Sequence, residues 1–168
     1  VIAIASAPSF DPNLFVSGIS SADYAALRDS PARPLLNRTM QGQYPPGSTV
    51  KPMYALAGLY YGINTPQSAV RDPGFYRLGG RGRKYRDWKK WGHGWSVDLD
   101  LAIAQSCDVY FYDLAHRLGI ERLHDFSVKF GLGSASGVDQ TSERPGVMPS
   151  NAWKQKALGQ PWYPGETL

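Results

Sequence analysis

The clearest hydrophobic period in the chain follows a Tyr-Pro-Pro-Gly turn at residues 44–47. The apolar side chains recur at the i, i+3, i+4, i+7 spacing of a helix that buries one face. They are Met53, Leu56, Ala57 and Tyr60. Pro52 fits such a helix only in its first turn, and Gly62 is placed to end it. The pattern therefore predicts one helix between the turn and Gly62.

The same reasoning places the other elements. Residues 1–6 read as a short buried strand, and residues 20–28 as a helix capped by Ser20 or Ser21. A helical run over 101–104, capped by Asp98 or Asp100, is interrupted at 106–108, resumes over 109–118 and stops at Gly119. A further helix over 120–130, ending at Gly131, should bury Ile120, Leu123, Phe126 and Phe130. Residues 64–97 show no period and are expected to form a long excursion, and residues 132–168 mostly turns.

Composition narrows the class of protein. The chain has 168 residues, enough for one domain, and contains 18 Gly and 13 Pro, which disfavours a helical bundle. Seven basic side chains against one acidic give residues 77–90 a charge of +6, which leaves −2 for the remainder of the +4 total. The charge is therefore local, and a nucleic-acid partner is not expected. The single cysteine, Cys107, excludes an intramolecular disulfide.

Two short motifs carry candidate chemistry. Ser48 and Lys51 open the first predicted helix one turn apart, so an amine lies beside a hydroxyl that it can activate as a nucleophile. Taken alone, this spacing is a weak signal, since it more often marks a helix cap followed by an exposed lysine. In the interrupted segment, Ser106 and Asp108 should point to one side and Cys107 to the other.

A metal site is the third candidate. Asp72, Asp87 and His93 flank the basic excursion, and with Cys107 they make a four-ligand set of the kind that binds zinc tetrahedrally. The spacing is irregular, and the alternative is that Cys107 is a small buried hydrophobe. His116 and His124 lie on predicted helices without partners and are read as surface or helix-end residues.

A Ser-x-x-K motif followed by a Ser-x-Asn-type triplet belongs to the signature of penicillin-binding proteins and serine β-lactamases. The chain resembles class B penicillin-binding proteins in residues 5–13, 37–38, 44–52 and 85–88, and residues 71–74, 91–94, 153–156 and 161–163 narrow the resemblance to the penicillin-binding protein 2 branch of the rod-shape elongation machinery. The resemblance implies that Ser48 is the acyl-accepting nucleophile, Lys51 its proton acceptor, and Ser106 with Asp108 the second motif. It also implies one structural zinc ion behind that motif, bound by Asp72, Asp87, His93 and Cys107.

The resemblance further implies an α+β fold of the penicillin-binding protein transpeptidase and serine β-lactamase type, with helices packed on an antiparallel sheet that is incomplete in this chain. Asp108 stands where many relatives carry Asn, and no Lys-Thr-Gly or Lys-Ser-Gly triplet occurs. We therefore expect residues 1–168 to be the N-terminal part of a single transpeptidase domain, truncated at both ends and inactive by itself.

The implied activity is that of a peptidoglycan D,D-transpeptidase that cross-links stem peptides during cell-wall elongation and is acylated by β-lactam antibiotics. The implied setting is the periplasmic face of the bacterial inner membrane, with a membrane anchor outside this chain, and the implied partners are the RodA glycosyltransferase and the MreC scaffold. Two alternatives stay open. One is the septal relative, penicillin-binding protein 3, which would lack the metal set, and the other is a non-catalytic module whose basic, Trp-rich loop binds an anionic polymer.

Overall fold

The computed structural model describes residues 2–168 and divides into two compact units. The first unit comprises the described residues up to Tyr44 together with Gly133–Val147, and the second comprises Pro45–Leu132 and Met148–Leu168. Among the described residues, no helix combines the length and the apolar character needed to cross a bilayer.

The first unit holds three short helices, η1 (Pro12–Phe15), α1 (Ser21–Arg28) and α2 (Arg38–Gln41). Ser20 caps α1 by accepting a hydrogen bond from the N–H of Asp23, which confirms the predicted helix and its cap. Only Met40 is buried among the described residues of this unit.

The strand predicted over residues 1–6 is wrong for the described part, and Val1 lies outside it. Ile2 and Ile4 are exposed, and residues 2–6 pair with no other segment of the described chain. This segment is attached instead through the Ser6 hydroxyl, which accepts the N–H of Arg38 at 2.9 Å. Without a neighbouring strand, the apolar run has no ladder of backbone hydrogen bonds to join.

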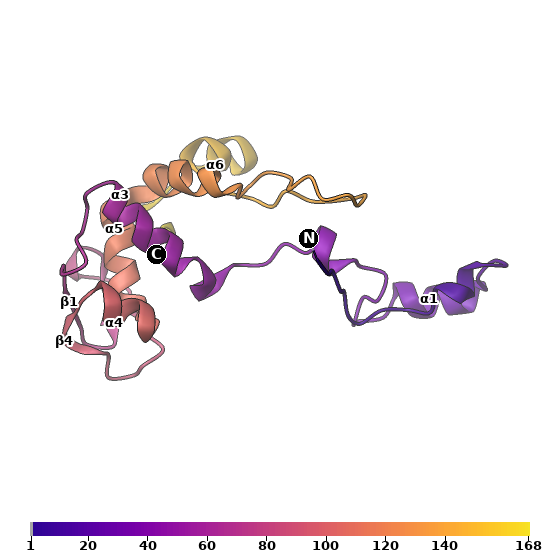
Figure 1. The fold of residues 1–168 in the computed structure, drawn as a ribbon, viewed down its shortest axis with the longest axis horizontal. Coiled ribbons are helices and arrows are strands. Elements are labelled where there is room, and N and C mark those ends of the chain that lie inside the picture. Colours follow the sequence, from indigo (N-terminus) through magenta and orange to yellow (C-terminus); the bar gives the residue numbers. More distant parts are fainter. Residues whose placement is uncertain (1) are drawn as a thin grey trace. The chain divides into compact units, whose positions relative to one another are not determined.

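The second unit is built around α5 (Asp108–Ser127), against which α3 (Lys51–Tyr60) and α4 (Leu99–Ala104) pack (Figure 1). Asp98 caps α4 as predicted. A single 3-10 turn, η2 (Gly47–Val50), leads directly into α3 and winds the chain from the Pro-Pro-Gly turn into the helix. The core of the unit lies between these helices.

The predicted buried face of α3 is only partly correct. Ala57 is fully buried, but Leu56 and Tyr60 are exposed, and the helix turns the small residues Ala55 and Gly58 inward instead. A β-carbon at Gly58 would lie 2.8 Å from Leu114 Cδ1 of α5. The close approach of the two helices therefore selects small side chains, which a search for large apolar residues overlooks.

The excursion over residues 64–97 forms two antiparallel two-stranded sheets. β1 (Val70–Asp72) pairs with β4 (Gly94–Val97), and β2 (Phe75–Tyr76) pairs with β3 (Tyr85–Arg86), with η3 (Leu78–Gly80) in the turn between them. α5 packs against β1, β2 and β3. Helices packed on small antiparallel sheets place the chain in the α+β class, as predicted.

The predicted break at Gly119 is confirmed, since Gly119 has φ 73° and α5 consists of two helical segments joined across a kink there. The second segment runs to Ser127 and is followed by a 3-10 turn, η4 (Val128–Phe130). Leu123 and Phe126 are buried as predicted, but Phe130 is exposed because it lies beyond the end of α5. Residues 132–168 are not all turns, since they contain α6 (Asn151–Leu158) and η5 (Pro164–Glu166). The only buried residue of α6 is Lys154, so no apolar period marks it in the sequence.

Candidate active site and metal-ligating cluster

Ser48 and Lys51 stand at the two ends of one 3-10 turn. The N–H of Lys51 donates to the carbonyl of Ser48, and side chains three residues apart in such a turn eclipse one another. Gly47 has φ 56°, a conformation that favours glycine, and it turns the chain after Pro46. Ser48 is exposed, and within the described chain its hydroxyl has no hydrogen-bond partner.

Lys51, in contrast, is buried and fully engaged. Its Nζ donates to the Ser106 carbonyl at 2.8 Å, to the Ser106 hydroxyl at 3.1 Å and to Asp108 Oδ1 at 2.5 Å. The three acceptors match the three N–H groups of an ammonium. The ring of Phe111 lies 5.5 Å from the same nitrogen and closes one side. The structure therefore joins the two predicted catalytic motifs through Lys51.

The break between α4 and α5 explains why both Ser106 and Asp108 reach Lys51. Ser106 has φ 53°, in the left-handed region that non-glycine residues seldom adopt, and Cys107 is the N-cap of α5. Ser106 and Asp108 contact Lys51, whereas Cys107 Sγ contacts Asp72. The side chains alternate across the tripeptide, as the sequence predicted.

Behind the tripeptide, the four predicted metal ligands converge. Each offers one ligand atom, and these atoms lie within 4.8 Å of one another. The Nδ1 atom of His93 lies 2.7 Å from Asp72 Oδ2 and 3.6 Å from Asp87 Oδ2, and Cys107 Sγ donates to Asp72 Oδ2 at 3.3 Å. The side chains of the histidine and both aspartates are completely buried.

The electrostatics of this cluster are unbalanced. Burial raises the pKa of the Cys107 thiol to about 12, and the neighbouring carboxylates add to the rise. Burial also acts to raise the pKa of Asp72, but hydrogen bonds from His93, from the N–H of Gly74 and from Cys107 outweigh it and leave that pKa below its ordinary value. Two buried carboxylates therefore face one imidazole and one protonated thiol.

The cluster and the lysine site are physically connected. Asp87 Oδ2 accepts the N–H groups of Asp108 at 2.8 Å and Val109 at 3.2 Å, so it caps the start of α5 from a distant segment. Asp108 Oδ2 accepts the N–H of Trp88 at 3.2 Å, and the Trp88 indole donates to the Gln105 carbonyl at 3.1 Å.

Sequence reasoning missed the part that Trp88 plays in this connection, although its place directly after a predicted metal ligand was a signal. The two remaining histidines are not part of either site. His116 Nδ1 lies 3.0 Å from the Tyr76 hydroxyl, and His124 Nδ1 lies 3.1 Å from the Pro149 carbonyl oxygen.

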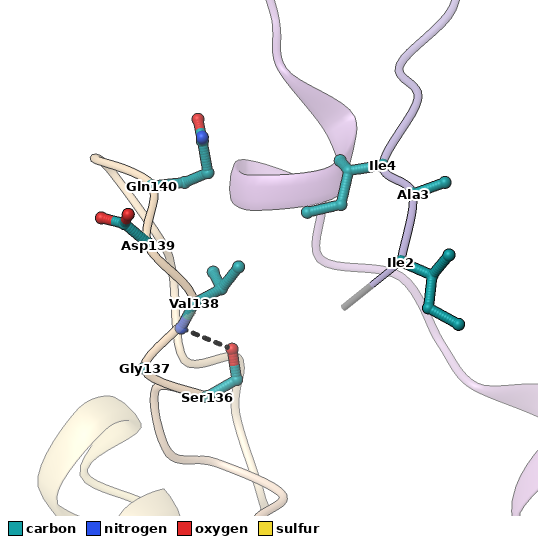
Figure 2. A pocket seen from close by; sticks show the side chains of 8 residues that line it. All are labelled: Ile2, Ala3, Ile4, Ser136, Gly137, Val138, Asp139 and Gln140. Atoms are coloured by element: carbon teal, nitrogen blue, oxygen red, sulfur yellow. Dashed lines mark hydrogen bonds between the residues drawn. The ribbon is translucent and has the colours of Figure 1, made fainter.

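A hollow of about 610 Å³ lies in the first unit, between residues 2–4 and the loop 136–140 (Figure 2). Its lining is mainly small or aliphatic, and the Val138 N–H donates to Ser136 Oγ within the loop. None of the predicted catalytic or metal-ligating residues lines it. Its size therefore gives no reason to move the candidate site there.

Comparisons with known proteins identify the family of the chain. The family described as "Penicillin binding protein transpeptidase domain" matches residues 1–162. The peptidoglycan D,D-transpeptidase MrdA of Escherichia coli K12 is 49% identical over 168 residues, which are 100% of this chain and 26% of that protein. The chain thus spans about a quarter of the length of this relative.

Two solved structures are similar in fold and sequence. Penicillin-binding protein 2 of Pseudomonas aeruginosa, in complex with WCK 5153, is 57% identical with a TM-score of 0.88, over 97% of this chain and 35% of that one. The complex between penicillin-binding protein 2 and MreC of Helicobacter pylori gives 40% identity and a TM-score of 0.90, over 98% and 30%. The relatives are proteins of the branch that the sequence resembles, which favours it over the septal alternative. This chain belongs to the penicillin-binding protein transpeptidase family.

Proposed function

We propose that the protein of which this chain is a part is a peptidoglycan D,D-transpeptidase of cell-wall elongation. The observation that carries the proposal is the position of Lys51 Nζ, held by Ser106 and Asp108 while its own backbone N–H fixes Ser48 one 3-10 turn away. An exposed serine hydroxyl, one 3-10 turn from a buried amine that other side chains hold in place, suits acyl transfer through a serine ester. The similarity to MrdA supports the same substrate class.

In the proposed reaction, the Ser48 oxygen attacks the carbonyl carbon of the penultimate D-alanine of a stem peptide. The ammonium of Lys51 first gives one proton to the second motif, the resulting amine takes the hydroxyl proton of Ser48, and the second motif passes its proton to the departing terminal D-alanine as the peptide bond breaks. The amine of a neighbouring stem peptide then attacks the ester carbonyl and forms the cross-link as the ester bond breaks, and its proton passes through Lys51 to the Ser48 oxygen. The backbone N–H of Ser48 would supply part of the oxyanion hole.

Intact mass spectrometry of the full-length protein tests this. Incubation with a β-lactam should add one acyl group, located on Ser48 by peptide mapping. The Ser48→Ala variant should stay unmodified, whereas Ser17→Ala, which removes another exposed serine, should be acylated like the wild type. An adduct that survives Ser48→Ala, or no adduct on the wild type, would refute the proposal.

We also propose that Asp72, Asp87, His93 and Cys107 bind one structural zinc ion. The fit is supported by the donor set itself, since carboxylate oxygen, imidazole nitrogen and sulfur are the ligands of zinc, and by the burial of both carboxylates without a matching cation. A bound zinc ion would keep the thiol ionised and neutralise the carboxylates. Four protein ligands leave no open position, so the role is to fix the excursion to the start of α5.

The metal can be tested without any activity measurement. Purified full-length protein should contain about one zinc ion, and His93→Ala should lose it while His116→Ala, at an exposed histidine, keeps it. If His93→Ala does not fold, replacement of zinc by cobalt in the wild type provides the answer, because a cysteine ligand produces a thiolate-to-cobalt charge-transfer band. A stable, metal-free wild type that shows no such band would refute the site.

The proposed function also implies two protein partners and a location in the cell. The structure of a relative bound to MreC supports MreC as a partner, and the elongation branch brings the RodA glycosyltransferase as a second one. The proposed location is the periplasmic face of the inner membrane, where stem peptides are cross-linked. β-Lactams are the expected inhibitors.

A further inference from the structure

The excursion carries a positive charge that nothing in the described chain neutralises. All seven basic side chains of residues 77–90 are exposed, and none of them forms an ion pair with a carboxylate of residues 2–168. The one acidic residue of the segment, Asp87, is buried in the metal-ligating cluster. We call these seven residues the basic surface: Arg77, Arg81, Arg83, Lys84, Arg86, Lys89 and Lys90.

Exposed aromatic rings border this surface. Trp88, Trp91 and Trp95 are 66%, 80% and 77% exposed, well above what is usual for tryptophan. Several rings carry a cation on one face: Arg71 lies 3.8 Å from the ring centroid of Trp95, and Lys90 lies 4.9 Å from that of Trp91. The result is a set of flat, charged platforms and not a continuous apolar patch.

The platforms are held in place relative to the candidate active site. The β2–β3 pairing fixes the base of the basic surface, and Trp88 is joined to the start of α5 through its N–H on Asp108 and its indole on Gln105. Asp108 in turn contacts Lys51. Trp88, which lies between Arg86 and Lys89 of the basic surface, therefore connects this surface to the side chain that holds Lys51.

We propose that the basic surface and its tryptophans bind the peptidoglycan strand itself, beyond the dipeptide that reacts. This inference rests on the proposed function and adds a second contact region to it. Stem peptides carry free carboxylates, which suit unpaired arginine and lysine, and the apolar faces of sugar rings stack on exposed indoles. An anionic membrane would also attract the charge, but insertion requires an apolar face, and here cations cover one face of two tryptophan rings.

The test uses the full-length protein and uncross-linked peptidoglycan strands as the probe. The variant Arg81→Glu/Arg83→Glu/Lys84→Glu reverses three charges of the basic surface. The matched control, Arg122→Glu/Lys129→Glu/Lys156→Glu, reverses three exposed charges elsewhere in the second unit. We expect the first variant to bind strands at least about tenfold more weakly, and the control to stay within about twofold of the wild type.

Three further measurements make the result decisive. Strands whose carboxylates have been amidated should bind the wild type as weakly as native strands bind the first variant. Trp91→Ala, which removes a stacking platform and no charge, should also weaken strand binding, and its acylation by a β-lactam should match the wild type. Binding to phosphatidylglycerol vesicles should weaken less than strand binding does when the three charges are reversed.

The proposal is overturned if the three charge reversals leave strand binding unchanged, if amidation has no effect, or if the loss appears on vesicles and not on strands. Acylation of Ser48 separates this failure from failure of the proposed function. If the protein is acylated but binds strands equally well without the basic surface, the proposed function holds and the strand-binding proposal is wrong. A protein that binds strands but is never acylated loses the transpeptidase activity.

Discussion

The two clusters on either side of Ser106-Cys107-Asp108 differ in how their charges are balanced. On one side, the cation of Lys51 meets the carboxylate of Asp108 and two oxygens of Ser106, so the site is complete within the chain. On the other side, two fully buried carboxylates face an imidazole and a thiol, and no lysine or arginine compensates them within the described residues. Burial of an unbalanced charge is costly.

The two charge balances indicate different roles for the two clusters. A balanced site that opens onto an exposed hydroxyl is suited to move a proton repeatedly. An unbalanced, closed site is suited to hold an ion permanently. Adjacent residues of one tripeptide serve the two clusters, but their side chains point to opposite sides. A change in the lysine site should therefore leave zinc binding intact, and a change in the metal-ligating cluster should leave acylation of Ser48 possible.

The largest effect is expected from Lys51→Met, which keeps an unbranched apolar stem and removes the amine. The rate at which a β-lactam acylates the full-length protein, measured by rapid mixing and mass spectrometry, should fall roughly 10³-fold because Ser48 loses its proton acceptor. The zinc content should not change. Lys129→Met, at an exposed lysine, should react normally. Near-normal acylation of Lys51→Met, or loss of zinc from it, would show that the two clusters are not assigned correctly.

The next largest effect concerns the thermal stability that the metal-ligating cluster provides. Removal of zinc by a chelator should lower the thermal unfolding midpoint by roughly 6 °C, because the buried carboxylates lose their counter-charge. Added zinc should restore the midpoint, as calorimetry can establish. Cys107→Ala serves as the control, since a protein that already lacks the site should not respond to the chelator. An unchanged midpoint in the chelated wild type contradicts the prediction.

A smaller effect is expected from Asp108→Asn, which replaces the carboxylate by an amide of nearly the same shape. Asp108 accepts hydrogen bonds from both Lys51 and Trp88, and an amide offers only one oxygen, so its NH₂ group must face one of these donors. Acylation should slow about tenfold, and Asp113→Asn, which disturbs only a surface pair with Arg117, should have no effect. A rate equal to the wild type would mean that the charge of Asp108 is dispensable.

Much of this site could be predicted because local rules govern it. The alternation of side chains in an interrupted helix placed Ser106 and Asp108 opposite Cys107, and the same rules gave the caps of α1 and α4. The donation of three hydrogen bonds by Lys51 to a segment 55 residues away could not be predicted, since it depends on how α3 packs on α5. The cap that Asp87 provides to α5 is equally non-local.

The errors in the fold have a common cause. Apolar residues were assigned to the interior, but Ile2, Ile4, Leu56, Tyr60 and Phe130 are exposed, while small residues line the contact of α3 with α5. α6 was missed for the opposite reason, because a lysine is its buried residue. Hydrophobic periodicity identifies helices that bury large side chains, and it does not report those held by an ion pair.

That ion pair gives the smallest prediction. Lys154 is buried and donates to both oxygens of Glu166 at 2.6 Å, and this hydrogen bond lowers the pKa of Glu166 below its ordinary value of 4.5. Because the pKa of Glu166 is lower in the folded segment, the ion pair stabilises this segment at pH values above the ordinary pKa. This contribution is lost as the pH falls through the lowered pKa. Glu166→Gln should accelerate hydrogen exchange of residues 159–168 about threefold near neutral pH, whereas Glu143→Gln in the first unit should not.

The pH dependence distinguishes an ion pair from simple packing in this last case. Corrected for the intrinsic exchange chemistry, the wild-type segment should approach the Glu166→Gln rate as the pH falls through the lowered pKa of Glu166, while the variant should stay constant. A wild type that keeps its protection in acid would show that the rings of Tyr163 and Trp162, 4.7 Å and 5.8 Å from Lys154 Nζ, hold the segment without the carboxylate. The exposed position of Glu166 makes the expected change small, because solvent screens the charge that it contributes.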